Sequence, residues 1–312
     1  MNDLPSHDPN RCRVIGVLDD GVASLGATAL AHLRTADVVI GGARTLALFR
    51  HALKPGTLTH DLTGQLKAVP GWVRAAREAH QSCVVLATGD PLCHGIAPYL
   101  AQHLCLDALE ILPNLSTLQL ACARVGLAWQ DARIVSVHAA DAGEWQRGAP
   151  PSHGLYALAQ ALRAEQRLLL LTSPANCPDR IARLLLAEGL GSDFHMAVAE
   201  DLLQPDEQVH AQLSPTEAAS MRFAELNVVL LWRTRPRPQP VRFGLADRAF
   251  EQRQPAKGLI TKQEGRAGSL ARLQLHADSV VWDIGAGSGS VGLEAARLCP
   301  QGHVWAIEKN EA

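Results

Sequence analysis

The stretch SVVWDIGAGSGSVG, residues 279–292, predicts a strand, a glycine-rich turn and the start of a helix in direct succession. Apolar residues lead into Asp283, and Gly285, Gly287 and Gly289 follow before the helix-like run GLEAARL. A turn of this composition at a helix N-terminus lets backbone amides approach a nucleotide-like cofactor closely. The stretch therefore predicts the opening of an α/β cofactor-binding domain.

The spacing of these glycines narrows the choice of cofactor. The dinucleotide pattern G-x-G-x-x-G, counted from Gly285, requires a glycine where Ser290 stands. The sequence instead has G-x-G-x-G after Asp283, and Glu308 closes the next strand-like run, HVWAIE. This arrangement resembles the first motif of Rossmann-like S-adenosylmethionine (SAM) methyltransferases; a dinucleotide site and a tight turn without a ligand are the alternatives. The resemblance implies SAM contacts from Asp283, Gly285, Gly287, Gly289 and, through the ribose hydroxyls, Glu308.

Composition limits the class of protein. The chain has 312 residues, which predicts about two domains. Its net charge of −2 provides no broad basic surface for nucleic acid, and no apolar run approaches the roughly 18 residues of a membrane span. Hydrophobic residues make up 47% and aromatic residues only 4%, a profile typical of helix-covered parallel sheets. We therefore expect neither a nucleic-acid nor a membrane partner.

The N-terminal residues and the cysteines indicate the compartment. The start MNDLPSHDPNRC lacks the basic and then apolar pattern of a secretory signal. The seven cysteines are an odd number and never form C-x-x-C. We therefore expect a cytoplasmic protein with reduced thiols and without a metal site.

Strand-like and helix-like patterns alternate over the first 233 residues. Helical patterns such as SHGLYALAQALRAE and PDRIARLLLAEGLG separate most of the apolar runs, and Pro178 marks one helix start. This alternation predicts α/β layers built on mainly parallel sheet. The apolar runs that we expect to be strands occupy residues 13–18, 37–42, 83–90, 109–114, 133–138, 167–173, 196–202 and 227–233.

A proline-rich segment divides the chain. TRPRPQP, residues 234–240, has prolines at alternate positions and predicts an extended, stiff linker. We expect a domain at 12–233, a Pro/Arg-rich linker at 234–255 and an incomplete Rossmann-like domain at 256–312. The two strands of this last domain would be interior in the usual strand order, so we expect unpaired edges and an exposed apolar face.

Polar residues follow several of the predicted strands, where α/β proteins bind their ligands. The run CVVLA leads into Thr88, Gly89 and Asp90, which combine a permissive backbone with a carboxylate at the strand tip. After LEILP, Ser116 is placed to cap the next helix or to contact a ligand. Caps and turns are the ordinary explanation for each residue alone, but their recurrence at several strand ends favours a common site.

The order of these motifs resembles that of the tetrapyrrole (corrin/porphyrin) methylase family. The resemblance is carried by VIGVLDDG, ADVVIGG, LATGDPLCHGIA, ILPNLSTLQLACARVGLAWQDA, VSVH, CPDRIARLLLAEGLG, AEDL, PDE and LNVVLL. It points to the branch that methylates carbon 5 of precorrin-6Y or cobalt-precorrin-7 in cobalamin synthesis. Residues 256–312 resemble the beginning of the second methyltransferase fused to that branch, which methylates carbon 15 and promotes decarboxylation.

The resemblance implies an α/β fold of two subdomains that enclose a cleft for SAM, followed by the start of a Rossmann-like SAM methyltransferase domain. The first loop departs from the usual G-x-G, because Leu18 stands at its second glycine and would crowd the approach to the cofactor. Carried over by motif, the SAM contacts in the first domain would come from Gly16, Gly21, Thr88, Gly89, Asp90, Ser116, Thr117, Thr172, Ser173, Ala199 and Asn227.

The implied reaction transfers a methyl group from the sulfonium of SAM to a carbon of a tetrapyrrole substrate. Alignment of the carbon, methyl and sulfur atoms supplies much of such catalysis, so the reaction requires no nucleophilic side chain. Asp90 and His138 are candidates for moving a proton after methylation, with a structural role as the alternative for His138. Basic side chains would anchor the substrate carboxylates, and the candidates are Arg44, Arg124 and Arg133.

The resemblance leaves the assembly and the activity open in three respects. Dimers are common in the family, so a homodimer is one expected assembly. Carbon-15 methylation and decarboxylation would need a complementing C-terminal methyltransferase polypeptide. Two alternatives to a carbon-5 methyltransferase remain: a non-catalytic relic that binds SAM or a tetrapyrrole, suggested by Leu18, and a nucleotide-cofactor oxidoreductase, disfavoured by Ser290.

Overall fold

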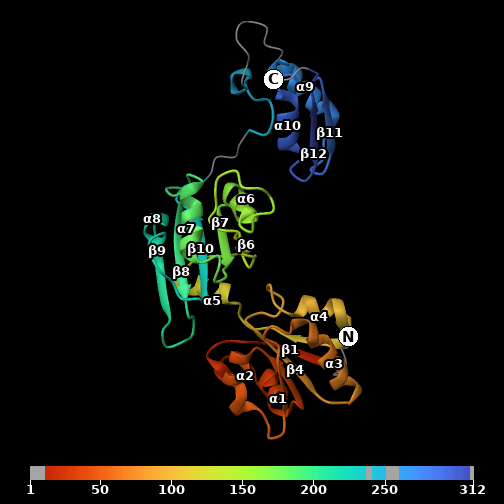
Figure 1. The fold of residues 1–312 in the computed structure, drawn as a ribbon, viewed down its shortest axis with the longest axis vertical. Coiled ribbons are helices and arrows are strands. Elements are labelled where there is room, and N and C mark those ends of the chain that lie inside the picture. The colour runs from red at the N-terminus through yellow and green to blue at the C-terminus, as the bar shows by residue number, and fades with distance from the viewer. Residues whose placement is uncertain (1–10, 237–240, 251–259, 310–312) are drawn as a thin grey trace, which may run out of the picture. The chain divides into compact units, whose positions relative to one another are not determined.

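The computed structural model of the chain describes residues 11–236, 241–250 and 260–309 (Figure 1). The chain divides into two compact units, Met1–Pro236 and Arg237–Ala312. The first unit contains two five-stranded sheets and the second a two-stranded sheet. Of the predicted linker at 234–255, residues 237–240 and 251–255 lie outside the described residues.

The first sheet has the strand order β3-β2-β4-β1-β5, and all its neighbouring strands are parallel. Parallel strands need a crossover connection, and helices supply most of these crossovers here. The strands are β1 (Cys12–Val17), β2 (Val38–Gly41), β3 (Leu58–Asp61), β4 (Cys83–Thr88) and β5 (Leu109–Leu112), and the helices are α1 (Ala27–Thr35), α2 (Ala43–Phe49), α3 (Val69–Glu78) and α4 (Ala97–Leu104).

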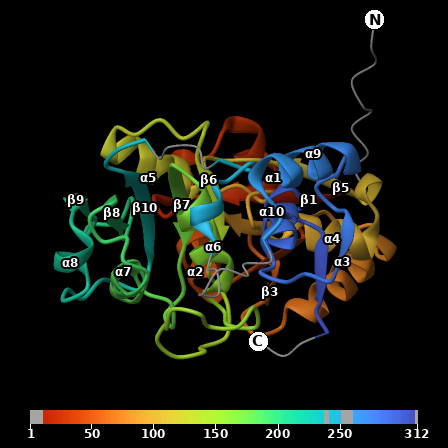
Figure 2. The same cartoon turned by 90° about the horizontal axis from the view of Figure 1, so that it is seen from above.

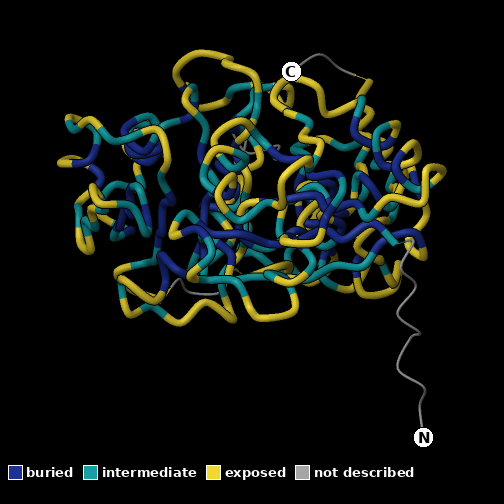
Figure 3. Tube along the Cα trace, turned by 90° about the horizontal axis from the view of Figure 1, so that it is seen from below, coloured by how far each residue is buried: buried dark blue, intermediate teal, exposed yellow. Residues whose placement is uncertain are grey.

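Helices cover both faces of this sheet, which explains the unbroken apolar runs of its inner strands. One face packs on α1 and α2, where Leu33 and Phe49 are fully buried, and the other packs on α3 and α4. All six residues of β1 are buried. Figure 3 shows how buried stretches alternate along the chain with exposed loops.

The second sheet has the strand order β6-β7-β10-β8-β9, and only β6 and β7 are parallel. The prediction of mainly parallel sheet is wrong for this half of the unit. A short segment, 201–207, joins β8 to β9, and so short a connection allows only antiparallel neighbours. The strands are β6 (Arg133–Ser136), β7 (Arg167–Leu171), β8 (Phe194–Glu200), β9 (Gln208–Leu213) and β10 (Asn227–Arg233).

Four helices cover the second sheet. Helices α6 (Tyr156–Ala164), α7 (Pro178–Ala187) and α8 (Pro215–Ala218) pack on one face, and α5 (Thr117–Val125) packs on the other. Figure 2 shows α5 and α7 on opposite sides of β8 and β10. Within the described part of the chain, no helix combines the length and the apolarity needed to cross a membrane.

The second unit contains α9 (Gln263–Leu273), β11 (Val280–Ile284), α10 (Ser290–Leu298) and β12 (His303–Ile307). A fully buried ion pair joins Arg266 on α9 to Glu294 on α10, with Nε and Oε1 3.3 Å apart. The Glu294 carboxylate also accepts hydrogen bonds from the backbone amides of Gly244 and Leu245. These bonds satisfy the buried charges and fix residues 244–245 against both helices.

Strands β11 and β12 are parallel and present an apolar face to solvent, as predicted. Val280, Trp282 and Ile284 alternate on this face of β11, and Ile284 is 74% exposed. Trp305 on β12 lies beside Trp282 in the register and is also exposed. A contiguous apolar surface of this kind is typical of an interaction surface.

The carboxyl ends of β1, β4 and β5 meet in a contact with no room for a side chain. A Cβ atom on Gly16 would overlap the Gly89 carbonyl oxygen and would lie 2.6 Å from the Asn114 amide nitrogen. The Gly89 amide donates to the Val17 carbonyl at 2.7 Å, and the Asn114 side chain donates to the Gly16 carbonyl at 3.2 Å. Gly16 is therefore required by the close packing of three backbones.

Substitution of this glycine should destabilise the first unit. Because the overlap is with backbone atoms, we expect Gly16→Ala to lower the free energy of unfolding by about 2 kcal/mol, as overpacking does. Denaturant unfolding followed by circular dichroism measures the change. Gly71→Ala is the matched control, since Gly71 lies exposed in α3 with no atom within 4 Å of its added Cβ. The control should raise stability by about 0.5 kcal/mol, and equal effects of the two substitutions would contradict the packing argument.

Candidate functional site

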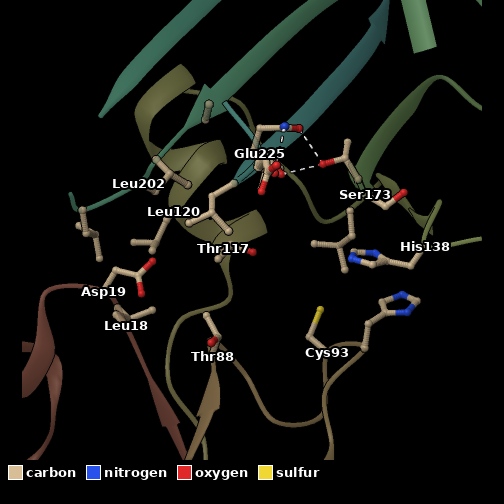
Figure 4. Close-up of a pocket in the computed structure, with 18 of the residues that line it drawn as sticks. Leu18, Asp19, Thr88, Cys93, Thr117, Leu120, His138, Ser173, Leu202 and Glu225 are labelled. Carbon is tan, nitrogen blue, oxygen red and sulfur yellow. Dashed lines mark hydrogen bonds between the residues drawn. The ribbon is translucent and has the colours of Figure 1, made fainter. Parts of the chain in front are cut away.

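A pocket of about 420 Å³ lies in the first unit, between residues of its two sheets. This volume falls within the range of roughly 300–1,000 Å³ that is usual for small-molecule sites. Figure 4 shows Leu18, Asp19 and Thr88 of the first sheet on one side, facing side chains such as Leu120 and Ser173 of the second half. Residues from both halves of the unit therefore form its wall.

Strand direction explains why the pocket lies where it does. Leu18 and Thr88 stand at the carboxyl ends of β1 and β4. In the second sheet, β10 runs antiparallel to β7 and β8, so that its first residue, Asn227, pairs with Glu200 at the end of β8. The ends of β7 and β8 and the start of β10 thus lie at the same edge of that sheet. The predicted site residues that line the pocket are Thr88, Thr117, His138, Thr172, Ser173, Ala199 and Asn227.

Four other predicted residues of the first domain are not among the lining residues and instead shape the loops around the pocket. Gly16 permits the backbone contact described above, and Gly21 and Gly89 have φ values of +71° and +72°, which glycine adopts without strain. Ser116 caps α5, because its hydroxyl accepts from the Gln119 amide while the Gln119 side chain accepts from the Ser116 amide.

Asp90, predicted both to bind SAM and to move a proton, forms a turn. Its Oδ1 accepts a hydrogen bond from the Leu92 amide at 2.8 Å, and it is also outside the pocket wall. The chain winds so tightly here that a Cβ on Gly95 would overlap the Pro91 carbonyl, and His94 has a φ of +54°. This turn carries Cys93 and His94 into the pocket wall.

The environment of the Cys93 sulfur at this turn favours the thiol form over the thiolate. Burial, with a contribution from the Asp90 carboxylate, raises the pKa of the Cys93 thiol above its usual value. The thiol form therefore predominates, whereas thiolate is the reactive form. His138 also lines the pocket, and its Nδ1 lies 3.4 Å from the Ser136 hydroxyl.

Thr172 and Asn227 form a hydrogen-bond network at the start of β10. The Thr172 hydroxyl lies 2.7 Å from Asn227 Oδ1 and 3.0 Å from the Asn227 carbonyl. The Asn227 side-chain amide donates to the Ala224 carbonyl at 2.6 Å. These bonds hold the segment before β10, whose residues Glu225 and Leu226 also line the pocket.

Leu18, expected to crowd the cofactor, packs into the apolar core between the halves of the unit. It is 5% exposed and belongs to the same cluster as Leu118, Leu120 and Leu202. The pocket beside it remains open. The side chain therefore forms part of the wall without filling the cavity.

The sequence interpretation missed part of the wall. Leu202 and Leu203 line the pocket from the β8–β9 connection, and Leu171 and Val228 line it from β7 and β10. The motif AEDLL placed the two leucines directly after the strand end, but apolar residues in a loop give no distinct signal of ligand contact. Only the pairing of the strands brings them to the site.

Two of the predicted substrate-anchoring arginines have carboxylate partners. Arg44 lines the pocket and pairs with Asp19, its Nη1 lying 3.0 Å from Oδ2. Arg124 pairs with Glu207, with Nε and Oε1 2.5 Å apart, and is not among the lining residues. Arg44 is therefore a pocket residue, whereas Arg124 binds the β8–β9 connection outside the pocket. In the described residues, no cluster of three or more His, Cys, Asp or Glu side chains forms a metal site.

The glycine-rich turn of the second unit has the predicted strand-turn-helix form. Gly285, Gly287 and Gly289 all have positive φ values, and Gly289 is the N-cap of α10. Of the two predicted acids, Glu308 binds the turn itself, accepting from the Gly287 amide at 2.8 Å. Asp283 accepts from the Gly292 amide in the first turn of α10, also at 2.8 Å, and so joins β11 to that helix.

Comparison with known proteins identifies the family. The family model for tetrapyrrole (corrin/porphyrin) methylases matches residues 12–215, and that for the precorrin methyltransferase domain matches residues 252–312. The chain is 34% identical over 284 residues to a precorrin-6Y C(5,15)-methyltransferase (decarboxylating) of a Sinorhizobium species, covering 90% of this chain and 63% of that relative. It is 29% identical over 218 residues to a cobalt-precorrin-7 C(5)-methyltransferase of Salmonella typhimurium, covering 70% of this chain and 96% of that relative.

Solved structures agree on the fold. The structure of a cobalt precorrin-4 methyltransferase, 18% identical, has a TM-score of 0.56 and covers 74% of this chain and 98% of its own. The family matches define a class of SAM-dependent methyltransferases, and the two sheets agree with its α/β fold. The chain belongs to the tetrapyrrole (corrin/porphyrin) methylases. This membership argues against a nucleotide-cofactor oxidoreductase.

A conservative substitution tests the role of Asp90. Because an asparagine oxygen also accepts the Leu92 amide in a turn of this kind, we expect Asp90→Asn to keep the methyl-transfer rate within about threefold of wild type. Loss of a general base would instead lower the rate by roughly 10²–10⁴. Initial rates of transfer from labelled SAM distinguish the two, and a hundredfold loss at unchanged stability would restore Asp90 as a catalytic residue.

Proposed function

We propose that this protein transfers the methyl group of SAM to carbon 5 of precorrin-6Y or its cobalt-bearing counterpart, cobalt-precorrin-7. The match that carries the proposal covers 218 residues of this chain and 96% of a cobalt-precorrin-7 C(5)-methyltransferase. The pocket of small-molecule size in the first unit supports it. The chain spans less than two thirds of the Sinorhizobium relative, whose name includes both positions, 5 and 15. Carbon-5 chemistry is therefore the activity that the first unit supports best.

The pocket residues suit displacement at a sulfonium methyl group. Such a reaction needs the nucleophilic carbon, the methyl and the sulfur in line, and its rate depends on holding them so. Leucines from both halves would enclose the cofactor, while the hydroxyls of Thr88, Thr117 and Ser173 offer hydrogen bonds at three points of the wall. The raised pKa of Cys93 favours its thiol form, and displacement at the sulfonium methyl needs no covalent intermediate. His138 and His94 are the imidazole side chains of the wall and are the candidates there for accepting or donating a proton.

The proposed division of the chain assigns this chemistry to residues 12–233 and the opening of a second methyltransferase to residues 256–312. The glycine-rich turn and the match to the precorrin methyltransferase domain support the second assignment. The exposed apolar face of β11 and β12 would suit packing by further protein, in the same chain or in a complementing one. We therefore propose that the 312 residues alone do not methylate carbon 15.

Product analysis tests both halves of this proposal. Incubation of the 312-residue chain with methyl-labelled SAM and precorrin-6Y, or with cobalt-precorrin-7, should yield product labelled at carbon 5 with its acetate side chains intact. Nuclear magnetic resonance of the isolated product locates the label, and mass spectrometry detects loss of carbon dioxide.

Two other results of the product analysis would contradict the proposal. Label at carbon 15, or loss of carbon dioxide, would contradict the proposed limit on the second unit. Tight binding of SAM without transfer to either substrate would contradict the enzyme assignment and favour a binding protein. A denatured sample and a sample without substrate serve as controls for transfer to water or to the protein itself.

A further inference from the structure

The connection between β8 and β9, residues 201–207, holds an unusual backbone beside the pocket. Asp201 and Leu203 have φ values of +46° and +65°, in the left-handed region that side chains other than glycine, asparagine and aspartate rarely adopt. For a leucine this conformation costs free energy and persists only where neighbouring contacts impose it. Both Leu202 and Leu203 line the pocket.

A carboxylate binds the backbone of Leu203. Glu207 Oε2 accepts a hydrogen bond from the Leu203 backbone amide at 2.7 Å. Arg124 on α5 binds the same carboxylate from the other side, with Nε 2.5 Å from Oε1 and Nη2 3.3 Å from Oε2. The Arg124 guanidinium, together with the Leu203 amide, lowers the pKa of Glu207, so the carboxylate is charged at neutral pH.

Arg124 lies on α5, a helix that is anchored in the hydrophobic core. Leu118, Leu120 and Ala121 of α5 are buried in the core cluster of the second sheet, and Leu202 belongs to that cluster. Thr117, at the start of the same helix, lines the pocket. Arg124 and Glu207, both outside the pocket, thus connect α5 to Leu203 in the pocket wall.

We propose that Glu207, oriented by Arg124, is a positioning residue of the SAM pocket: its carboxylate fixes Leu203 in the left-handed conformation that completes the apolar wall. The inference rests on the proposed function, because it takes SAM as the occupant. Neither charged side chain touches the cofactor. Their effect on binding is transmitted through the backbone of residue 203.

The test compares two carboxylates that make the same kind of bond. Glu217 also accepts a backbone amide, that of Ser214, in the capping box of α8, but α8 does not contribute to the pocket. Affinity for S-adenosylhomocysteine is measured by isothermal titration calorimetry, and stability by denaturant unfolding, for wild type, Glu207→Ala and Glu217→Ala. We expect Glu207→Ala to weaken binding about tenfold, as release of a strained residue would. Glu217→Ala should lower stability with affinity unchanged.

Further variants separate positioning from simple destabilisation. Glu207→Gln keeps an oxygen that can accept from Leu203 and should bind within about threefold of wild type, whereas Arg124→Met should weaken binding although it removes no atom of the pocket wall. Wild-type affinity in both Glu207→Ala and Arg124→Met would overturn the inference while leaving the proposed function intact. If Glu207→Ala does not fold, Arg124→Met and Glu207→Gln decide the question. Absence of binding by the wild-type chain would overturn the proposed function, and this inference with it.

Discussion

The site depends on the contact of three backbones at the carboxyl ends of β1, β4 and β5. Gly16 has no space for a Cβ, and hydrogen bonds from Gly89 and Asn114 join the loops that follow these strands. The loop after β4 therefore lies against the end of β1, and the loop after β5 leads directly into α5. This places Leu18, Thr88 and Thr117 around one cavity.

The two sheets differ in strand direction, and so they bring residues to the pocket in different ways. In the parallel first sheet, all carboxyl ends lie at one edge, which is the usual ligand edge of an α/β sheet. In the second sheet the antiparallel β10 brings its first residue to the edge at which β7 and β8 end. Asn227 consequently stands beside Thr172 and Ala199, although more than twenty-five residues of sequence separate Asn227 from either partner.

Many polar residues near the pocket are engaged in holding backbone. Ser116 caps a helix, Asp90 closes a turn, and Thr172 binds Asn227. The wall between them is rich in leucine. A site of this kind suits a reaction in which enclosure and alignment of the reactants matter more than an acid or a base. In the proposal above, the charged pair of Arg124 and Glu207 likewise holds backbone, that of the loop after β8.

The sequence by itself determined the strands of the first unit that are buried on both faces, the glycine-rich turn of the second unit and the family. Continuous apolar runs and the motifs ATGDP and DIGAGSG are local patterns, readable without any partner. Strands β3 and β9 lack such runs and were missed, and the antiparallel pairing of β10 was not predicted because strand direction depends on contacts between distant segments. Only the tertiary structure decided which strand-end residues line the pocket, which of them shape its loops, and that Leu18 packs into a wall. Those outcomes depend on contacts between backbone groups and side chains that are far apart in the sequence. The local pattern of one segment does not show which distant segments it will contact.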